Sequence, residues 1–219
     1  MYLFPDAVIM VFCKAPIPGQ VKTRLIPVIT ANEAAQLHIE LTEKTVQTAT
    51  QKPLCEVQLW CSPISEHPFF FRLTQTYSVR RQVQQGQDLG DRMHFAFCQA
   101  FAHFRHAIII GCDCPSLTNK DLEQALSLLT NGKQCVIAPA EDGGYVLIGL
   151  SQPQVTLFED MPWGTEKVLA LTRAKLQSLN LDFNELNTQW DVDTVVDLER
   201  YRSGKAPSVK ESLENTTFF

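Results

Sequence analysis

Two hydrophobic periods alternate along the first 140 residues of the chain. Short runs of apolar or β-branched residues predict strands at 7–13, 54–61, 78–83, 107–112 and 135–139. Between them, helical spacing predicts helices at 31–50, 65–76, 91–104 and 119–130. A repeated strand–helix–strand order implies right-handed crossovers. It therefore predicts an α/β fold, with a mainly parallel sheet covered by helices on both faces.

Two helix starts carry a recognisable signal. Thr30 followed by Glu33 is a capping box, and Thr118 followed by Asp121 is a near relative of one. The later part of the chain is less regular. It predicts strands at 145–150 and 181–186, a helix at 165–179 and a closing helix after Asp193. We expect residues 1–202 to form one domain and residues 203–219 to form a polar C-terminal tail.

Composition narrows the class of protein. Hydrophobic residues make up 45% and charged residues 20% of the chain, and the net charge of −5 disfavours a nucleic-acid partner. No apolar run has membrane length, and the first residues lack the pattern of a signal peptide. The seven cysteines lie mostly in apolar runs, which predicts reduced, buried thiols. We therefore expect a cytoplasmic protein with no nucleic-acid or membrane partner.

The segment after the first strand is the most informative one. Its sequence is Lys14-Ala15-Pro16-Ile17-Pro18-Gly19-Gln20-Val21-Lys22-Thr23-Arg24, with three cations, two prolines and one glycine. Ligands of open α/β sheets bind at the carboxyl ends of strands, and Lys and Arg suit a polyphosphate. The segment matches neither the dinucleotide fingerprint nor the P-loop. It predicts a nucleotide site.

Three aspartates are candidate metal ligands. Asp113 follows the strand predicted at 107–112, where it could hold Mg²⁺ or Mn²⁺ against a diphosphate. Alternatively, Asp113 caps the turn through its own side chain. Asp191 and Asp193 are two residues apart in an extended segment and so point the same way. Asp193 could instead cap the helix that follows. Neither Asp113 nor Lys22 is expected in the core.

Two segments with glycines complete the set of candidates. The segment Gln85-Gly86-Gln87-Asp88-Leu89-Gly90 permits a turn against a flat ligand, or is a plain loop in which Asp91 caps the next helix. The segment Glu141-Asp142-Gly143-Gly144-Tyr145 joins carboxylates to glycines that allow close approach of a ligand. It is also a hairpin-turn signal, and both interpretations can hold. Trp163 could line an acceptor site. The five histidines are interpreted as surface or half-buried residues.

Together these motifs resemble the nucleotide-diphospho-sugar transferases of the GT-A type. The likeness is closest to the bacterial arsenosugar-type glycosyltransferase family, related to the 2-phospho-lactate guanylyltransferases, and it covers the chain to about residue 200. It implies a three-layer α/β/α sandwich with a Rossmann-like sheet. One departure is that Gly111-Cys112-Asp113 stands where these enzymes usually have Asp-x-Asp.

The resemblance also implies residue roles. The nucleotide would be bound by Lys14, Pro18, Gly19, Lys22, Arg24, Gln85, Gly86, Asp88 and Gly90. A metal ion, Mg²⁺ or Mn²⁺, would be held by Asp113, Asp191 and Asp193. The acceptor would lie near Gly143, Gly144, Tyr145 and Trp163. The catalytic residues would be Lys22, Asp113 and Asp142.

Two reactions agree with these expectations. In glycosyl transfer, a nucleotide-sugar gives its sugar to a small-molecule acceptor, with Asp142 as base. In nucleotidyl transfer, a nucleoside triphosphate joins a phosphorylated small acid, and pyrophosphate leaves. Glu141 and Asp142 favour the first reaction, whereas the single Asp113 and the three cations favour the second. The family resemblance decides for glycosyl transfer. A non-catalytic nucleotide-binding module is a third hypothesis, and a homodimer is left open.

Overall fold

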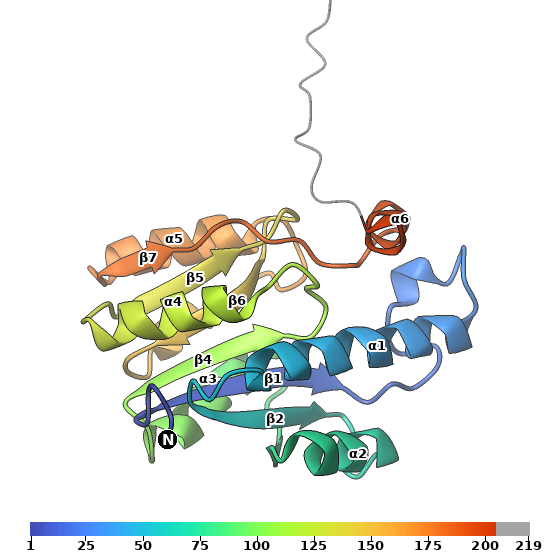
Figure 1. Cartoon of the computed structure of the whole chain (residues 1–219). Coiled ribbons are helices and arrows are strands. Elements are labelled where there is room, and N and C mark those ends of the chain that lie inside the picture. Colours follow the sequence, from blue (N-terminus) through green and yellow to red (C-terminus); the bar gives the residue numbers. More distant parts are fainter. Residues whose placement is uncertain (205–219) are drawn as a thin grey trace, which may run out of the picture.

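The computed structural model describes residues 1–204, so the tail predicted from residue 203 lies almost entirely outside the described residues. Seven strands form one sheet in the order β3-β2-β1-β4-β6-β5-β7 (Figure 1). They are β1 (Ala7–Lys14), β2 (Glu56–Ser62), β3 (Arg80–Val83), β4 (His106–Gly111), β5 (Cys135–Pro139), β6 (Tyr145–Leu150) and β7 (Phe183–Glu185).

The sheet is parallel except at β6, which pairs antiparallel with both β4 and β5. The reason is the short turn after β5, where Gly143 N donates to Ala140 O at 3.2 Å. A strand that returns through so tight a turn must run antiparallel to the one before it. The predicted mainly parallel sheet is confirmed.

Helices cover both faces of the sheet. They are α1 (Ala31–Thr50), α2 (Pro68–Tyr77), α3 (Leu89–Phe101), α4 (Asn119–Thr130), α5 (Val168–Ser178) and α6 (Val195–Ser203), with short 3₁₀ turns η1 (Thr23–Leu25) and η2 (Val155–Leu157). Residues of α1, α2 and α4 pack on one face, and residues of α3, η2 and α5 pack on the other (Figure 1). The expected three-layer sandwich is therefore confirmed.

Local capping explains where the helices begin. Both predicted caps are full capping boxes, Thr30 with Glu33 and Thr118 with Asp121. The prediction that Asp91 caps α3 is wrong. The cap is Asp88, whose carboxylate accepts from the Asp91 amide at 2.8 Å. An Asp at the N-cap satisfies an amide that the helix itself leaves without a partner.

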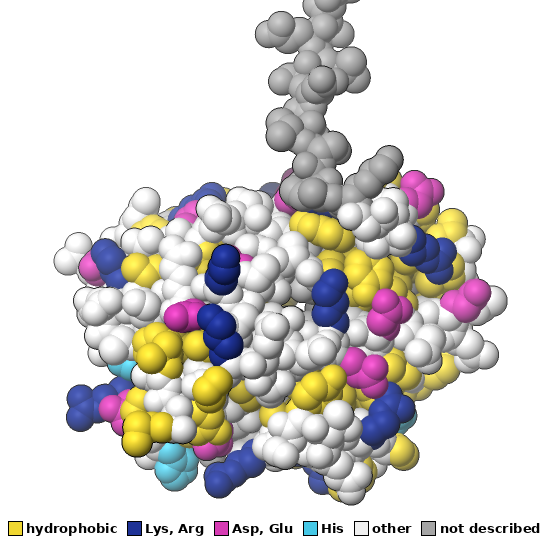
Figure 2. Space-filling model, viewed as in Figure 1, with side chains coloured by type: hydrophobic (Ala, Val, Ile, Leu, Met, Phe, Trp, Pro, Cys, Tyr) yellow, Lys and Arg dark blue, Asp and Glu magenta, His cyan; other side chains and the backbone are white. Residues whose placement is uncertain are grey.

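A third apolar cluster ties the end of the described chain to its beginning. Leu198 of α6 and Val192 pack with Leu25 of η1 and with Leu37 and Leu41 of α1. Figure 2 shows hydrophobic side chains at the surface in this region, where Val28 and Val196 are among the exposed ones. The cluster holds the segment before α6 against the loop after β1.

Two further findings concern the whole described chain. All seven cysteines are free thiols, and six are buried, whereas Cys98 is exposed. Within residues 1–204, no helix combines the length and the apolar character needed to cross a bilayer.

Candidate functional site

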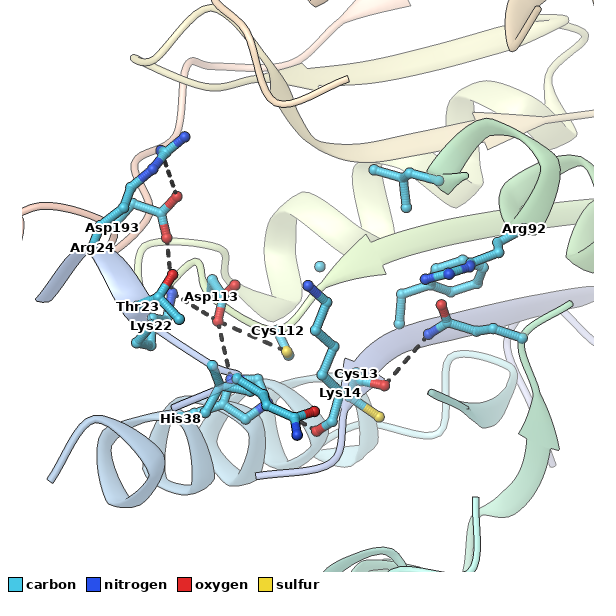
Figure 3. A pocket seen from close by; sticks show the side chains of 16 residues that line it. Cys13, Lys14, Lys22, Thr23, Arg24, His38, Arg92, Cys112, Asp113 and Asp193 are labelled. Atoms are coloured by element: carbon cyan, nitrogen blue, oxygen red, sulfur yellow. Dashed lines mark hydrogen bonds and ion pairs between the residues drawn. The ribbon is translucent and has the colours of Figure 1, made fainter. Parts of the chain in front are cut away.

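A cavity of about 430 Å³ opens at the carboxyl ends of β1 and β4 (Figure 3). It lies at the edge of the sheet where the sequence predicted a nucleotide site. Four cationic side chains line it, and so do several neutral and acidic ones: Lys14, Lys22, Arg24, Arg92, Gln84, His38, Cys112, Asp113 and Asp193. Such a cavity suits an anionic ligand.

Lys22 is the centre of an ion-pair network in the wall of this cavity. Its side chain is only 2% exposed, and its Nζ lies 2.9 Å from Asp113 Oδ1 and 3.1 Å from Asp193 Oδ1. Arg24 reaches the other oxygen of Asp193 at 3.3 Å. The structure thus joins residues predicted to bind phosphate with residues predicted to bind metal. As expected, Lys22 is not part of an apolar core cluster, but the two carboxylates and its position in the cavity wall bury its side chain.

The backbone of Lys22 is also unusual. Its φ angle is 49°, in the left-handed region that few residues other than glycine adopt. The conformation turns the side chain inward, where both carboxylates hold it. Burial alone would lower the pKa of Lys22, but the attraction of Asp113 and Asp193 outweighs burial and raises it well above its usual range.

The same network keeps Asp113 ionised. Burial alone would raise the pKa of Asp113, but Lys22 and then His38 outweigh it and hold this pKa far below its usual range. The carboxylate does not cap its own turn, because its recorded partners are the side chains of Lys22, His38 and Cys112. The turn-capping alternative for Asp113 is therefore wrong.

Asp191 has the opposite character. Burial first, and then the charges of Asp193 and Asp142, raise its pKa to about 7. The other candidate carboxylates are thus close enough to Asp191 to repel its charge. Asp193 does not cap α6, since Thr194 caps that helix in a box with Asp197. The capping alternative for Asp193 is wrong as well.

His38 is a site residue that the sequence interpretation missed. It is buried, at 3% exposure, and its Nε2 lies 3.0 Å from the carbonyl oxygen of Lys14. Its Nδ1 faces Asp113 Oδ1 at 3.5 Å. The interpretation as a surface or half-buried residue was wrong for His38. A signal existed, because His38 follows Ala34 and precedes Leu41 on the apolar stripe of α1.

The loop after β3 and the start of α3 contribute different residues from those expected. Gln84, Leu89 and Arg92 line the cavity. Gln84 Nε2 donates to Trp60 O at 2.8 Å, and Arg92 Nε donates to Gly86 O at 3.2 Å.

The residues that the sequence predicted in this segment have roles in capping and packing instead. Asp88 caps α3, and a Cβ on Gly90 would lie 2.5 Å from Phe158 O and 2.8 Å from Trp163 Nε1. Gln85, Gly86, Asp88 and Gly90, like Pro18 and Gly19, are not among the lining residues of the cavity. Their nucleotide-binding roles stay predictions.

The candidate acceptor residues lie outside the cavity lining as well. Asp142 is exposed and accepts from the Gly144 amide at 2.9 Å, as in a hairpin turn. A Cβ on Gly143 would lie 2.3 Å from Glu166 O, so this glycine permits close packing. The Tyr145 hydroxyl and the Trp163 Nε1 are both buried. Of this group, only Asp142 is tied to the carboxylate cluster, through its repulsion of Asp191.

The fold and this cation-lined cavity define the class of protein: a nucleotide-diphospho-sugar transferase fold. A crystal structure from Desulfovibrio desulfuricans G20, provisionally named a nucleotide-diphospho-sugar transferase, is 29% identical with a TM-score of 0.83. The match covers 96% of this chain and 92% of that one. The chain belongs to the family described as uncharacterized protein conserved in bacteria (DUF2064), which matches residues 45–165.

More distant structures share the fold. One is CMP:2-keto-3-deoxy-manno-octonic acid synthetase complexed with CTP, at 14% identity and a TM-score of 0.58, over 90% of this chain and 97% of that one. Another is glucosyl-3-phosphoglycerate synthase from Mycobacterium tuberculosis in complex with Mn²⁺, UDP and glucosyl-3-phosphoglycerate. It is 9% identical with a TM-score of 0.57, and the match covers 89% of this chain and 75% of that one. No curated protein matches the chain. The resemblance to nucleotide-diphospho-sugar transferases is confirmed, and the arsenosugar-type assignment stays a prediction.

Proposed function

We propose that this protein is a metal-dependent transferase that moves a glycosyl group from a nucleotide-sugar to a hydroxyl of a small-molecule acceptor. The observation that carries the proposal is the cavity itself, in which cations and an ionised Asp113 meet at the carboxyl edge of the sheet. The similarity to a protein provisionally named a nucleotide-diphospho-sugar transferase supports it.

Two of the four cations are free to bind a diphosphate. Within residues 1–204, neither Lys14 nor Arg92 has a carboxylate oxygen within 4 Å. In Figure 3, Lys14 lies between the Lys22 network and Arg92. Arg24, which is largely exposed, can add a further contact. A charge-assisted hydrogen bond to phosphate is about twice as strong as a neutral one.

The three aspartates would suit a hard divalent cation by their chemistry, with Asp113 and Asp193 in the cavity lining and Asp191 outside it. Asp113, Asp191 and Asp193 offer oxygen donors, which Mg²⁺ and Mn²⁺ prefer. Burial first, and then repulsion by Asp193 and Asp142, raises the pKa of Asp191 to about 7, and such a cation would relieve the repulsion. When bound, the metal would neutralise charge on the diphosphate of the donor.

The remaining chemistry belongs to side chains of this chain. Lys22 and its cationic neighbours would stabilise the nucleoside diphosphate as the bond between its oxygen and the sugar carbon breaks. The acceptor oxygen forms the new bond to that carbon, and Asp142 would take the hydroxyl proton. A base of this kind accelerates transfer by about 10²–10⁴-fold.

Nucleotidyl transfer is the second candidate, and one observation favours it. Arg92 adds a cation to the three that the sequence indicated around the cavity, and a nucleoside triphosphate has more charge to neutralise than a nucleotide-sugar. Its attacking group, a phosphate, is already ionised and needs no base such as Asp142.

A thermal-shift panel tests the proposal and separates the two reactions. The chain is melted with nucleotide-sugars and with the matching nucleoside triphosphates, in Mg²⁺, in Mn²⁺ and in EDTA. A ligand at 100 times its Kd adds about 2.7 kcal/mol of stability, which is readily measured. We expect the largest metal-dependent shift with a nucleotide-sugar. A shift confined to triphosphates would replace glycosyl transfer by nucleotidyl transfer.

Lys14→Met and Lys52→Met are the matched variants. Lys52 precedes β2, at the opposite edge of the sheet from the cavity, so its loss controls for the loss of one positive charge. Lys14→Met should lose most of the ligand-induced shift, whereas Lys52→Met should keep it. No shift with any nucleotide, or an equal loss in both variants, would overturn the proposal.

A further inference from the structure

The contacts of His38 determine its tautomer. Its Nε2 lies 3.0 Å from the carbonyl oxygen of Lys14, which can only accept a hydrogen bond. Nε2 therefore carries a hydrogen, and in the neutral ring the lone pair is on Nδ1. Nδ1 lies 3.5 Å from Asp113 Oδ1, so in this form of the ring both atoms can bind one metal ion.

A thiol completes this arrangement. Cys112 Sγ lies 3.9 Å from Asp113 Oδ1, and the ligand atoms of His38, Cys112 and Asp113 all lie within 4.8 Å of one another. Bonds of about 2.0–2.3 Å to a tetrahedral zinc ion would place its ligand atoms roughly 3.3–3.8 Å apart. The distances to Asp113 Oδ1, 3.5 Å from His38 Nδ1 and 3.9 Å from Cys112 Sγ, are in or close to that range.

We propose that His38, Cys112 and Asp113 form a Zn²⁺ site in the floor of the cavity. A nitrogen, sulfur and oxygen donor set suits Zn²⁺, whereas Mg²⁺ takes oxygen ligands. The hydrogen bond from Nε2 to a backbone carbonyl is the outer contact that orients histidines bound to metal. Three protein ligands leave a fourth position, which faces the cavity.

The site is accessible, and one cation competes for it. His38 and Cys112 are 3% and 4% exposed, but both line the cavity together with Asp113, whose side chain is 39% exposed. Lys22 Nζ holds Asp113 Oδ1 at 2.9 Å and also reaches Asp193 at 3.1 Å. Zn²⁺ would therefore displace Lys22 from Asp113 and leave it paired with Asp193. Zn²⁺ would also compete with Mg²⁺ or Mn²⁺, because Asp113 belongs to both donor sets.

Cobalt titration of the full chain tests the site directly. Co²⁺ substitutes for Zn²⁺ and gives a charge-transfer absorption when a thiolate binds it, and added Zn²⁺ then removes that absorption. The chain offers a matched control in Cys98, an exposed thiol 3.5 Å from His94 Nε2 on α3. We expect Cys112→Ser to abolish the absorption and Cys98→Ser to keep it.

A second pair of variants covers the case in which Cys112→Ser does not fold. His38→Gln should weaken Co²⁺ binding by at least about tenfold, in line with the loss of a metal contact. Lys22→Met removes the cation that competes for Asp113, so this variant should bind Co²⁺ more tightly. Absorption that persists in Cys112→Ser, or that is lost in Cys98→Ser, would overturn the site, as would unchanged affinity in His38→Gln. No nucleotide is added, so this outcome is separate from that of the proposed function.

Discussion

Individual charged side chains near the cavity differ in whether they already form an ion pair with a group of opposite charge. The side chain of Lys22 is buried and pairs with two carboxylates, whereas within residues 1–204 Lys14 has no carboxylate partner. Asp191 is half-buried near other carboxylates. The three therefore respond differently to substitution, although all three were predicted from sequence as site residues. Their responses would distinguish residues that only bind ligand from residues that also stabilise the folded protein.

Lys22→Met should destabilise the free protein. It leaves Asp113 and Asp193 without their buried partner, and a charged group left unsatisfied costs about 1–3 kcal/mol. The cost stays below that of a fully buried pair because the two carboxylates are 39% and 35% exposed. Urea unfolding would measure the change, with Lys14→Met as the control that keeps the midpoint of the parent. Equal midpoints for the two variants would contradict this account.

Asp191→Asn should stabilise the metal-free protein, and by more at high pH than at low pH. The pKa of Asp191 is about 7 in the folded chain and near 3.9 when unfolded, so the folded state holds the extra proton between these values. The stability that this carboxyl contributes is present at low pH and is lost as the pH rises through 7. Melting in EDTA at pH 5 and pH 8.5 checks this.

The gain in melting temperature of Asp191→Asn over the parent should be clearly larger at pH 8.5 than at pH 5. Asp182→Asn, at a surface position, controls for the loss of a carboxylate. A gain that is the same at both pH values would show that ionisation of the buried Asp191 carboxyl is not the cause.

At the scale of helices and strands, two glycines at the ends of elements differ in how closely other atoms pack around them. A Cβ on Gly90, at the start of α3, would lie 2.5 Å from Phe158 O, whereas a Cβ on Gly111, at the end of β4, would meet nothing within 4 Å. Gly90→Ala should therefore cost about 1–3 kcal/mol, as expected for overpacking.

Gly111→Ala should leave stability unchanged. Gly111 lines the cavity, so the added methyl group should instead weaken nucleotide binding. Thermal melting with and without ligand compares the two variants. A stable Gly90→Ala, or a Gly111→Ala that binds as the parent does, would contradict the packing described.

Most elements were predictable because their signals are local. The strands at 135–139 and 145–150 and the helices at 31–50 and 119–130 have the predicted bounds, since apolar periodicity and capping residues mark them. The start of α2 was placed three residues early because His67 caps that helix and Pro68 occupies its first turn. The antiparallel direction of β6 does not follow from periodicity, but the hairpin-turn signal between 139 and 145 agrees with it.

The candidate site was predictable where a strand end delivers a charged residue, as for Lys14 and Asp113. It was not predictable where a residue reaches the cavity from a helix. His38 and Arg92 are such residues, and their positions depend on how α1 and α3 pack against the sheet. The apolar stripe of α1 indicates that His38 is buried, but local sequence signals do not show that it reaches the cavity.

At the scale of the whole molecule, the segment before α6 matters because it places Asp193 beside the cavity. Its anchor is Leu198, which packs against η1 and α1. Leu198→Ala should lower stability by about 2–4 kcal/mol and weaken nucleotide binding as well, because Asp193 would lose its fixed place. Val196, on the same helix but 73% exposed, is the control. Val196→Ala should change neither urea unfolding nor the ligand-induced thermal shift.

The pairing of Lys22 with Asp193 also has a consequence for how the protein is made. These residues are 171 positions apart. At about 5–20 residues per second, a ribosome needs roughly 10–30 s between adding one and adding the other. During that time β1 and its cationic loop exist without the carboxylate that later holds Lys22. A growing chain therefore completes this cavity only after Asp193 has been added.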